Sequence, residues 1–259
     1  MDKRITRIVG WIKDYAEQAG KDSLVVGVSG GVDSALTSTL CCMTGKLVFA
    51  VTMPLRSKER DVQLAEYHLD WLENRFPDNL CQRVIPLDEP FKELKGAVAL
   101  KKVDGEYMNK TPLSTHADAN TKSRLRMTCL YHVASCIDGL VVGTGNKVED
   151  FGVGFFTKWG DGGVDLSPIG DLMKSEVREL AEELEIPEEI ITQDPTDGLW
   201  EDGRTDEDQL QISYEEIERC MRGEEVSKDV QGRFKALQDA SRHKMEPIPV
   251  CRMDDGWEF

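Results

Sequence analysis

The sequence lacks the usual marks of a membrane, secreted or nucleic-acid-binding protein. No apolar run in its 259 residues approaches the roughly 20 residues of a membrane-spanning helix. The N-terminus, residues 1–10, is charged and has no apolar signal core. Acidic residues outnumber basic ones by 48 to 32, which disfavours general binding to a phosphate backbone. These absences predict a cytoplasmic protein with no membrane and no nucleic acid among its partners.

Patterns of cysteine and histidine that bind metals are also missing. The seven cysteines are odd in number and contain no Cys-x-x-Cys pair, and the four histidines contain no His-x-x-x-His pair. A disulfide framework or a zinc site made of these residues is therefore not expected. Most of the cysteines are predicted to be buried thiols in a reducing compartment.

Apolar strands alternate with amphipathic helices along the first 145 residues. Short apolar runs predict strands at residues 24–28, 47–53, 83–87 and 140–143. Helical spacing predicts helices at residues 3–19, 33–43, 58–74, 91–100, 117–137, 171–184, 213–222 and 229–241. This alternation predicts one α/β domain over residues 1–259, with a Rossmann-like open, mostly parallel sheet and helices on both faces. Residues 194–210 lack periodicity, and we expect residues 198–210 to form a mobile lid loop within this domain.

A glycine-rich segment lies between the first predicted strand and the following helix. It consists of Ser29, Gly30, Gly31, Val32, Asp33 and Ser34, and we call it the phosphate loop. Glycines allow close approach of the backbone to an anion, and the free N–H groups at a helix start can bind phosphate. Asp33 alone would repel a phosphate, so its presence favours a bridging divalent cation, Mg²⁺. The segment is neither a Walker A loop nor a G-x-G-x-x-G fingerprint, and an ordinary glycine turn with an Asp cap is the alternative.

Two further strand ends point to the same edge of the sheet. Met53 ends the second strand, where its backbone could contact adenine, although a plain strand end before Pro54 is an equal alternative. Thr144 follows the fourth strand, and Glu149 could supply a second carboxylate to the metal near Asp33.

The phosphate loop resembles the pyrophosphate loop of N-type ATP pyrophosphatases. These enzymes cleave ATP between its α and β phosphates, but the motif does not select the acceptor substrate. Other stretches of the sequence indicate which acceptor substrate is used. They are residues 122–127, 154–165, 168–174 and 194–200, with Asp206-Glu207 and residues 242–244. Together they resemble the ammonia-dependent NAD synthetase family over nearly the whole chain. The distance from Glu149 to Lys158 is one residue longer than the commonest spacing in that family.

The resemblance implies a fold, a reaction and a set of site residues. The fold would be adenine nucleotide alpha-hydrolase-like. The reaction would be the ATP-dependent amidation of deamido-NAD with ammonia to NAD, AMP and pyrophosphate, through an acyl-adenylate. The implied ATP contacts are the phosphate loop, Thr144, Lys174 and Thr196, to which the strand-end argument adds Met53. The implied deamido-NAD contacts are Arg124, Lys158, Asp165, His243 and Lys244, and the Mg²⁺ ligands are Asp33 and Glu149. The implied catalytic residues are Asp33, Glu149, Lys174 and Asp161, of which Asp161 receives or deprotonates ammonium.

The resemblance also implies a homodimer that binds the dinucleotide between its subunits. Glutamine-dependent relatives have a large N-terminal amidase domain, and this chain begins only one helix before the first strand, so we expect free ammonia as the nitrogen source. A separate glutaminase subunit is the alternative, which we do not expect. Two alternatives remain from the sequence. One is another N-type ATP pyrophosphatase, such as a GMP synthetase subunit, and the other is a nucleotide-binding regulator without catalysis.

Overall fold

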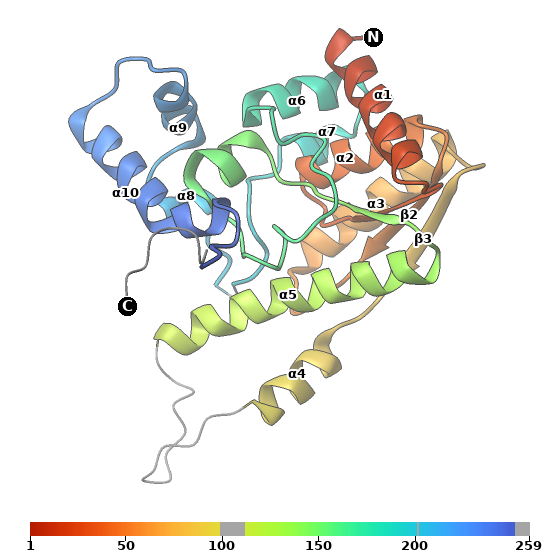
Figure 1. Cartoon of the computed structure of the whole chain (residues 1–259), viewed down its shortest axis with the longest axis horizontal. Helices are drawn as coiled ribbons and strands as arrows, with labels where there is room; N and C mark the ends of the chain where they lie inside the picture. Colours follow the sequence, from red (N-terminus) through yellow and green to blue (C-terminus); the bar gives the residue numbers. More distant parts are fainter. Residues whose placement is uncertain (99–111, 201, 252–259) are drawn as a thin grey trace.

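The centre of the fold is a four-stranded parallel sheet with the order β3-β2-β1-β4 (Figure 1). The computed structural model describes residues 1–98, 112–200 and 202–251. The strands are β1 (Ser23–Gly27), β2 (Leu47–Thr52), β3 (Leu80–Val84) and β4 (Leu140–Val142). Val25 of β1 pairs with Phe49 of β2 on one side and with Val141 of β4 on the other. The predicted open parallel sheet is confirmed.

Helices cover both faces of this sheet. One face packs against α1 (Lys3–Gln18), α2 (Val32–Met43), α3 (Glu59–Arg75), α6 (Lys174–Glu183) and α7 (Glu188–Ile191). The other face packs against α4 (Asp88–Ala97) and the long α5 (Pro112–Cys136), which runs below the sheet in Figure 1. Along β1, Leu24 and Val26 belong to the first core and Val25 to the second, as the alternation of a strand requires. None of the helices in the described ranges has both the length and the apolar character to cross a membrane.

A third apolar cluster lies beside the sheet. It joins the π-helix η1 (Lys147–Val153) to α8 (Asp206–Leu210), α9 (Tyr214–Met221) and α10 (Lys228–Met245), which are at the left of Figure 1. Val148, Val153 and Ile217 are at its centre and are almost fully buried. This cluster fixes η1 at the carboxyl end of β4.

Several boundaries differ from those expected. The third strand is at Leu80–Val84 rather than at 83–87, because this edge strand is only half-buried and its apolar pattern is weak. The long helix begins at Pro112 rather than at residue 117, since proline is well suited to a first helical turn. The helix expected from residue 171 begins at Lys174.

The expected loop over residues 194–210 contains a helix. Thr205 caps α8 by accepting a hydrogen bond from the Asp208 N–H, and the Asp208 carboxylate accepts one in return from the Thr205 N–H. The short helix α7 and the π-helix were not expected either. Residues 99 and 100, predicted to end a helix, lie outside the described residues.

Candidate active site

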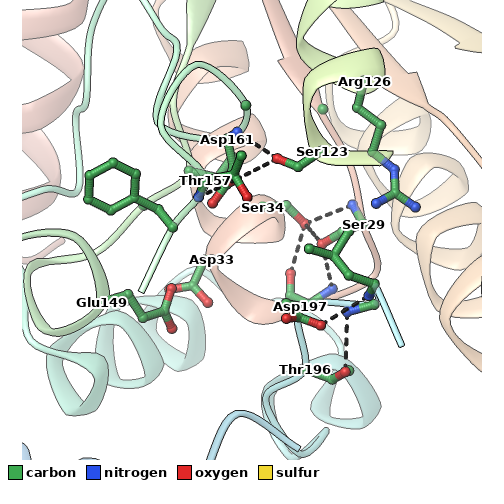
Figure 2. Close-up of a pocket in the computed structure, with 18 of the residues that line it drawn as sticks. Ser29, Asp33, Ser34, Ser123, Arg126, Glu149, Thr157, Asp161, Thr196 and Asp197 are labelled. Atoms are coloured by element: carbon green, nitrogen blue, oxygen red, sulfur yellow. Dashed lines mark hydrogen bonds between the residues drawn. The ribbon is translucent and has the colours of Figure 1, made fainter. Parts of the chain in front are cut away.

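A pocket of about 520 Å³ opens at the carboxyl ends of the strands. Its walls come from the segments that follow β1, β2 and β4, from α5, and from residues 193–200. Ligands of open parallel sheets bind at this edge, where strand order reverses between neighbouring connections. β1 lies between β2 and β4, so the phosphate loop that follows it is at the centre of the pocket (Figure 2).

The phosphate loop is held by hydrogen bonds of its own. The Ser34 hydroxyl accepts a bond of 3.1 Å from the Ser29 N–H and donates one of 2.9 Å to the Gly31 carbonyl. Gly30 has φ +92°, and a Cβ there would lie 2.4 Å from the Asp61 carbonyl oxygen, so only glycine fits. The loop leads directly into α2, whose first N–H groups have no partner within the helix. The local structure therefore supports anion binding.

Two carboxylates share one lysine beside this loop. The Lys174 ammonium lies 2.5 Å from Asp33 Oδ2 and 2.9 Å from Glu149 Oε1, and the lysine side chain is 3% exposed. The Asn146 amide donates a further bond of 2.9 Å to Asp33 Oδ1. The local charge of these groups is negative, because two carboxylates face a single ammonium.

Burial and pairing act in opposite directions on these groups. Burial raises the pKa of Asp33 above its ordinary value, although Lys174 partly offsets this. Burial would also raise the pKa of Glu149, but Lys174 and the Tyr214 hydroxyl outweigh it and lower that pKa. The two carboxylates raise the pKa of Lys174 despite its burial, so this lysine remains charged.

Tyr214 joins Glu149 to a third carboxyl group. Its hydroxyl oxygen lies 2.6 Å from Glu149 Oε1 and 3.0 Å from Asp206 Oδ2. A phenol has one proton to donate, so the two contacts require a proton on one of the carboxyl groups. Burial, with the nearby Glu149 charge, raises the pKa of Asp206 to about 7, which makes Asp206 the protonated partner. Asp206 Oδ1 is buried and has no hydrogen-bond partner among the described residues.

Asp161 lies on another side of the pocket, close to Ser123 and Thr157 (Figure 2). Its Oδ1 accepts bonds of 2.6 Å from the Ser123 hydroxyl and 3.0 Å from the Thr157 N–H. A Cβ at Gly160 would lie 2.2 Å from the Ser123 hydroxyl oxygen, so the turn between these partners requires glycine. One carboxylate oxygen is therefore fixed by the protein and the second is available to a ligand.

Glu149 lies in the π-helix η1. The Asn146 side chain caps it by accepting bonds of 3.0 Å from the N–H groups of Val148 and Glu149. π-turns inside helices are frequent at functional sites. From this turn, Glu149 Oε1 lies 2.9 Å from the Lys174 ammonium.

The pocket brings together most of the expected site residues, and others lie outside its lining. The lining includes Ser29, Gly30, Gly31, Val32, Asp33, Ser34, Met53, Thr144, Glu149, Asp161, Lys174, Thr196 and Lys244. Arg124, Lys158, Asp165 and His243 do not belong to it.

The residues outside the pocket have other partners. The Lys158 ammonium donates 2.9 Å to the His243 carbonyl, and Arg124 donates 3.3 Å to the Lys158 carbonyl. The carboxylate of Asp165 accepts bonds from the Tyr131 hydroxyl and the Val141 N–H, so it is used within the fold.

Some residues that line the pocket, or that contact its carboxylates, were absent from the expected site. Ser123 lies inside the stretch 122–127 and Asn146 lies between Thr144 and Glu149, but their links to Asp161 and Asp33 have no sequence signal. Tyr214 is 65 positions from Glu149 and lies in an ordinary amphipathic helix. Arg126 also lines the pocket from α5.

The sequence model of the NAD synthase family matches residues 4–248. This chain belongs to the NAD synthase family. It is 39% identical over 256 residues to an NH(3)-dependent NAD(+) synthetase from Carboxydothermus hydrogenoformans, covering 97% of this chain and 98% of the relative. The family membership does not favour a GMP synthetase subunit or a regulator without catalysis.

Two solved structures share the fold over 97% of this chain. An NMN synthetase from Francisella tularensis has a TM-score of 0.86 at 29% identity, covering 97% of this chain and 98% of that one. An NH3-dependent NAD synthetase from Campylobacter jejuni has a TM-score of 0.73 at 26% identity, covering 97% and 100%.

Proposed function

We propose that this NAD synthase family member uses ATP to join ammonia to the carboxylate of deamido-NAD, with NAD, AMP and pyrophosphate as products. It would thus be an amide-forming ligase that completes NAD biosynthesis in the cytoplasm. The observation that supports this most strongly is the pocket itself. The phosphate loop, the cluster of Asp33, Glu149 and Lys174, and the partly free carboxylate of Asp161 all line it.

ATP would bind across the carboxyl ends of β1 and β2. The N–H groups of the phosphate loop would hold the pyrophosphate portion, and the backbone of Met53 would contact adenine. Thr144 and Thr196 line the same pocket and would supply hydroxyl donors. Lys174 would face the phosphates as a point charge.

Asp33 and Glu149 form a donor set that fits Mg²⁺. Magnesium is usually held by one or two carboxylates together with substrate phosphates, and these two carboxylates have more negative charge than Lys174 neutralises. When bound there, the cation would supply positive charge that stabilises the pyrophosphate leaving group. Asn146 would keep Asp33 oriented toward it.

The reaction would proceed in two steps. The carboxylate of deamido-NAD attacks the α phosphorus of ATP, and pyrophosphate leaves toward the phosphate loop and Lys174. Asp161 would bind ammonium through its free oxygen and accept a proton from it, which leaves nucleophilic ammonia. Ammonia then attacks the carbonyl carbon of the acyl-adenylate, and AMP leaves. Positioning and charge stabilisation would supply most of the rate enhancement.

The deamido-NAD site would extend from the pocket onto the surface. Lys244 lines the pocket, while Arg124, Lys158 and His243 form a connected group outside it. Asp165 would support this site indirectly, because its carboxylate holds the Tyr131 hydroxyl and the Val141 N–H in place. Such an elongated site suits a dinucleotide.

A homodimer would complete this outer part of the site. The aromatic rings of Trp11 and Tyr15 are 5.7 Å apart and exposed by 44% and 38%, and the Tyr15 hydroxyl donates to the Asp165 carbonyl. An exposed aromatic pair beside an expected substrate residue supports a subunit contact there, with a total buried area above about 2,000 Å². Sedimentation at micromolar concentration tests this, since a fully active species of about 29 kDa would refute the shared site.

Nicotinate mononucleotide is a second candidate for the acceptor. The Francisella tularensis NMN synthetase is the more similar of the two solved structures by TM-score, 0.86 against 0.73. Nicotinate mononucleotide would present the same nicotinate carboxylate as deamido-NAD and lack the adenylyl half. The chemistry in the pocket would be unchanged.

One assay distinguishes these acceptors. Pyrophosphate release and amide formation are measured with ATP, Mg²⁺ and ammonium, and with deamido-NAD, nicotinate mononucleotide or XMP as acceptor. We expect turnover with deamido-NAD and none with XMP, and we expect glutamine to replace ammonium poorly. A higher kcat/KM for nicotinate mononucleotide would support the second acceptor, and turnover with XMP alone would refute both.

A further inference from the structure

Arg126 is a half-buried cation in the pocket that forms no ion pair with any residue the structure describes. Its Nε lies 3.3 Å from the Met53 carbonyl oxygen and its Nη2 lies 3.4 Å from the Ser57 hydroxyl oxygen, so both contacts are long. Within residues 1–98, 112–200 and 202–251, no carboxylate is within ion-pair distance of it, and Nη1 makes no hydrogen bond. A guanidinium is always charged and has five donors. Most of its binding capacity is therefore unused.

The other two cations of the pocket are already engaged. Lys174 is matched by Asp33 and Glu149, and Lys244 donates to the backbone carbonyls of Gly154 and Phe156. Of the described cations that line the pocket, Arg126 is therefore the one without a close partner, although the charges of Asp161, Asp197 and Asp88 act on it from beyond ion-pair distance. An unpaired charge in a partly buried site is costly unless an anion accompanies it.

The position of Arg126 indicates which anion this is. In Figure 2, Arg126 and the Asp33–Glu149 pair lie on opposite sides of Ser34. The Met53 carbonyl, which Arg126 contacts, is at the end of β2, where the proposed function places adenosine. The pyrophosphate would lie over the phosphate loop and the Asp33–Glu149 side. The phosphate closest to adenosine is the α phosphate.

We infer that Arg126 is a further catalytic residue that binds the non-bridging oxygens of the α-phosphoryl group, in ATP, in the acyl-adenylate and in AMP. This rests on the proposed adenylation. The α phosphorus is attacked in the first step and departs with AMP in the second, so one fixed cation would act in both. Its planar fork suits two oxygens of one phosphate, and its contacts to Met53 and Ser57 set its orientation before the substrate binds.

A comparison of AMP with adenosine tests the assignment without turnover. Binding of each is measured by calorimetry to the wild type, Arg126→Gln, Arg126→Lys and Arg60→Gln. Arg60 is an exposed arginine in the first turn of α3, so its loss controls for a change in net charge. We expect Arg126→Gln to reduce the preference for AMP over adenosine at least tenfold, while adenosine binding changes less than threefold. Arg60→Gln should leave both affinities unchanged.

The conservative variant separates charge from structure. Arg126→Lys should keep more of the AMP preference than Arg126→Gln, because an ammonium still supplies positive charge. Equal losses of AMP and adenosine affinity in both variants would show a structural role and overturn the inference. Circular dichroism establishes whether each variant is folded. If Arg126→Gln does not fold, the AMP preference of Arg126→Lys decides between the two roles.

Kinetics supply the second readout. Arg126→Gln should lower kcat by about 10²-fold, the size expected when one preorganised donor to developing charge is removed. If AMP discrimination is retained and only the KM for deamido-NAD rises, then Arg126 binds the nicotinate carboxylate and the inference is wrong. If the wild type binds neither AMP nor ATP, the proposed adenylation itself fails. If it discriminates AMP through Arg126 but makes no amide, only the proposed acceptor fails.

Discussion

Replacing Lys174 with methionine should destabilise the protein strongly unless a divalent cation is present. Methionine preserves most of the side-chain volume, so the change removes mainly the charge that Asp33 and Glu149 share. The variant then holds two carboxylates close together with no cation between them.

The size of the effect follows from the burial of this group. Lys174 is 3% exposed, and its two partners are 16% and 17% exposed. Removing one partner of a buried ion pair costs about 3–5 kcal/mol, because the remaining charge is desolvated and unpaired. Lys46→Met is a matched control, since its side chain is 9% exposed but its partner Asp22 is fully exposed. Lys46→Met should therefore lower the free energy of unfolding by only about 0–1 kcal/mol.

Urea unfolding monitored by circular dichroism measures both losses, with and without millimolar Mg²⁺. Mg²⁺ should restore more stability to Lys174→Met than to the wild type, because the variant has two unpaired carboxylates to bind it. The double variant Lys174→Met/Asp33→Asn should be more stable than Lys174→Met alone. A loss below about 1 kcal/mol for Lys174→Met, with no selective effect of Mg²⁺, would show that the three groups are not coupled.

Three further predictions concern the same pocket. Asp33→Asn and Glu149→Gln should each abolish Mg²⁺-dependent pyrophosphate release without unfolding the protein, because one carboxylate remains to pair with Lys174; normal Mg²⁺-dependent activity in either variant would remove that residue from the metal site. The pKa of Asp206 is about 7, raised above its ordinary value of 3.8, so the folded state keeps a proton that the unfolded chain releases, and stability falls as pH rises through this range. The free energy of unfolding of the wild type should fall by about 3 kcal/mol between pH 5 and 8 because of this group, and Asp206→Asn should lack that fall. Equal pH profiles of the urea midpoints of the two proteins would contradict the raised pKa of Asp206. Residues 198–210 should resist limited proteolysis better with ATP than without it; equal cleavage rates would argue against a lid.

The central part of the fold could be predicted because its strands are buried on both faces. β1, β2 and β4 consist of continuous apolar runs bounded by glycine, proline or turn residues, which is how fully buried parallel strands are recognised. β3 is at the sheet edge with one neighbour and half-exposed side chains, so its weaker pattern misplaced it by three residues. The short helix α8 begins at a capping box, but the segment around it has no helical periodicity, so the sequence did not predict this helix.

The site could be predicted only where its residues share a motif. The phosphate loop was identified because glycines and hydroxyls lie between a strand and a helix, and the structure places all of it in the pocket. Tyr214 and Asp206 reach Glu149 from distant helices, and their contact depends on the third apolar cluster rather than on any local spacing. The π-helix has no local sequence signal of its own, because its composition is that of an ordinary helix.

The most direct test of the account follows the oxygen atoms of the acceptor. Deamido-NAD with ¹⁸O in its nicotinate carboxylate is incubated with ATP, Mg²⁺, ammonium and the protein, and the products are analysed by mass spectrometry. If the carboxylate attacks the α phosphorus, AMP gains one ¹⁸O atom for each NAD formed, and pyrophosphate gains none. Label in inorganic phosphate, with ADP as the nucleotide product, would show attack at the γ phosphorus and contradict the acyl-adenylate.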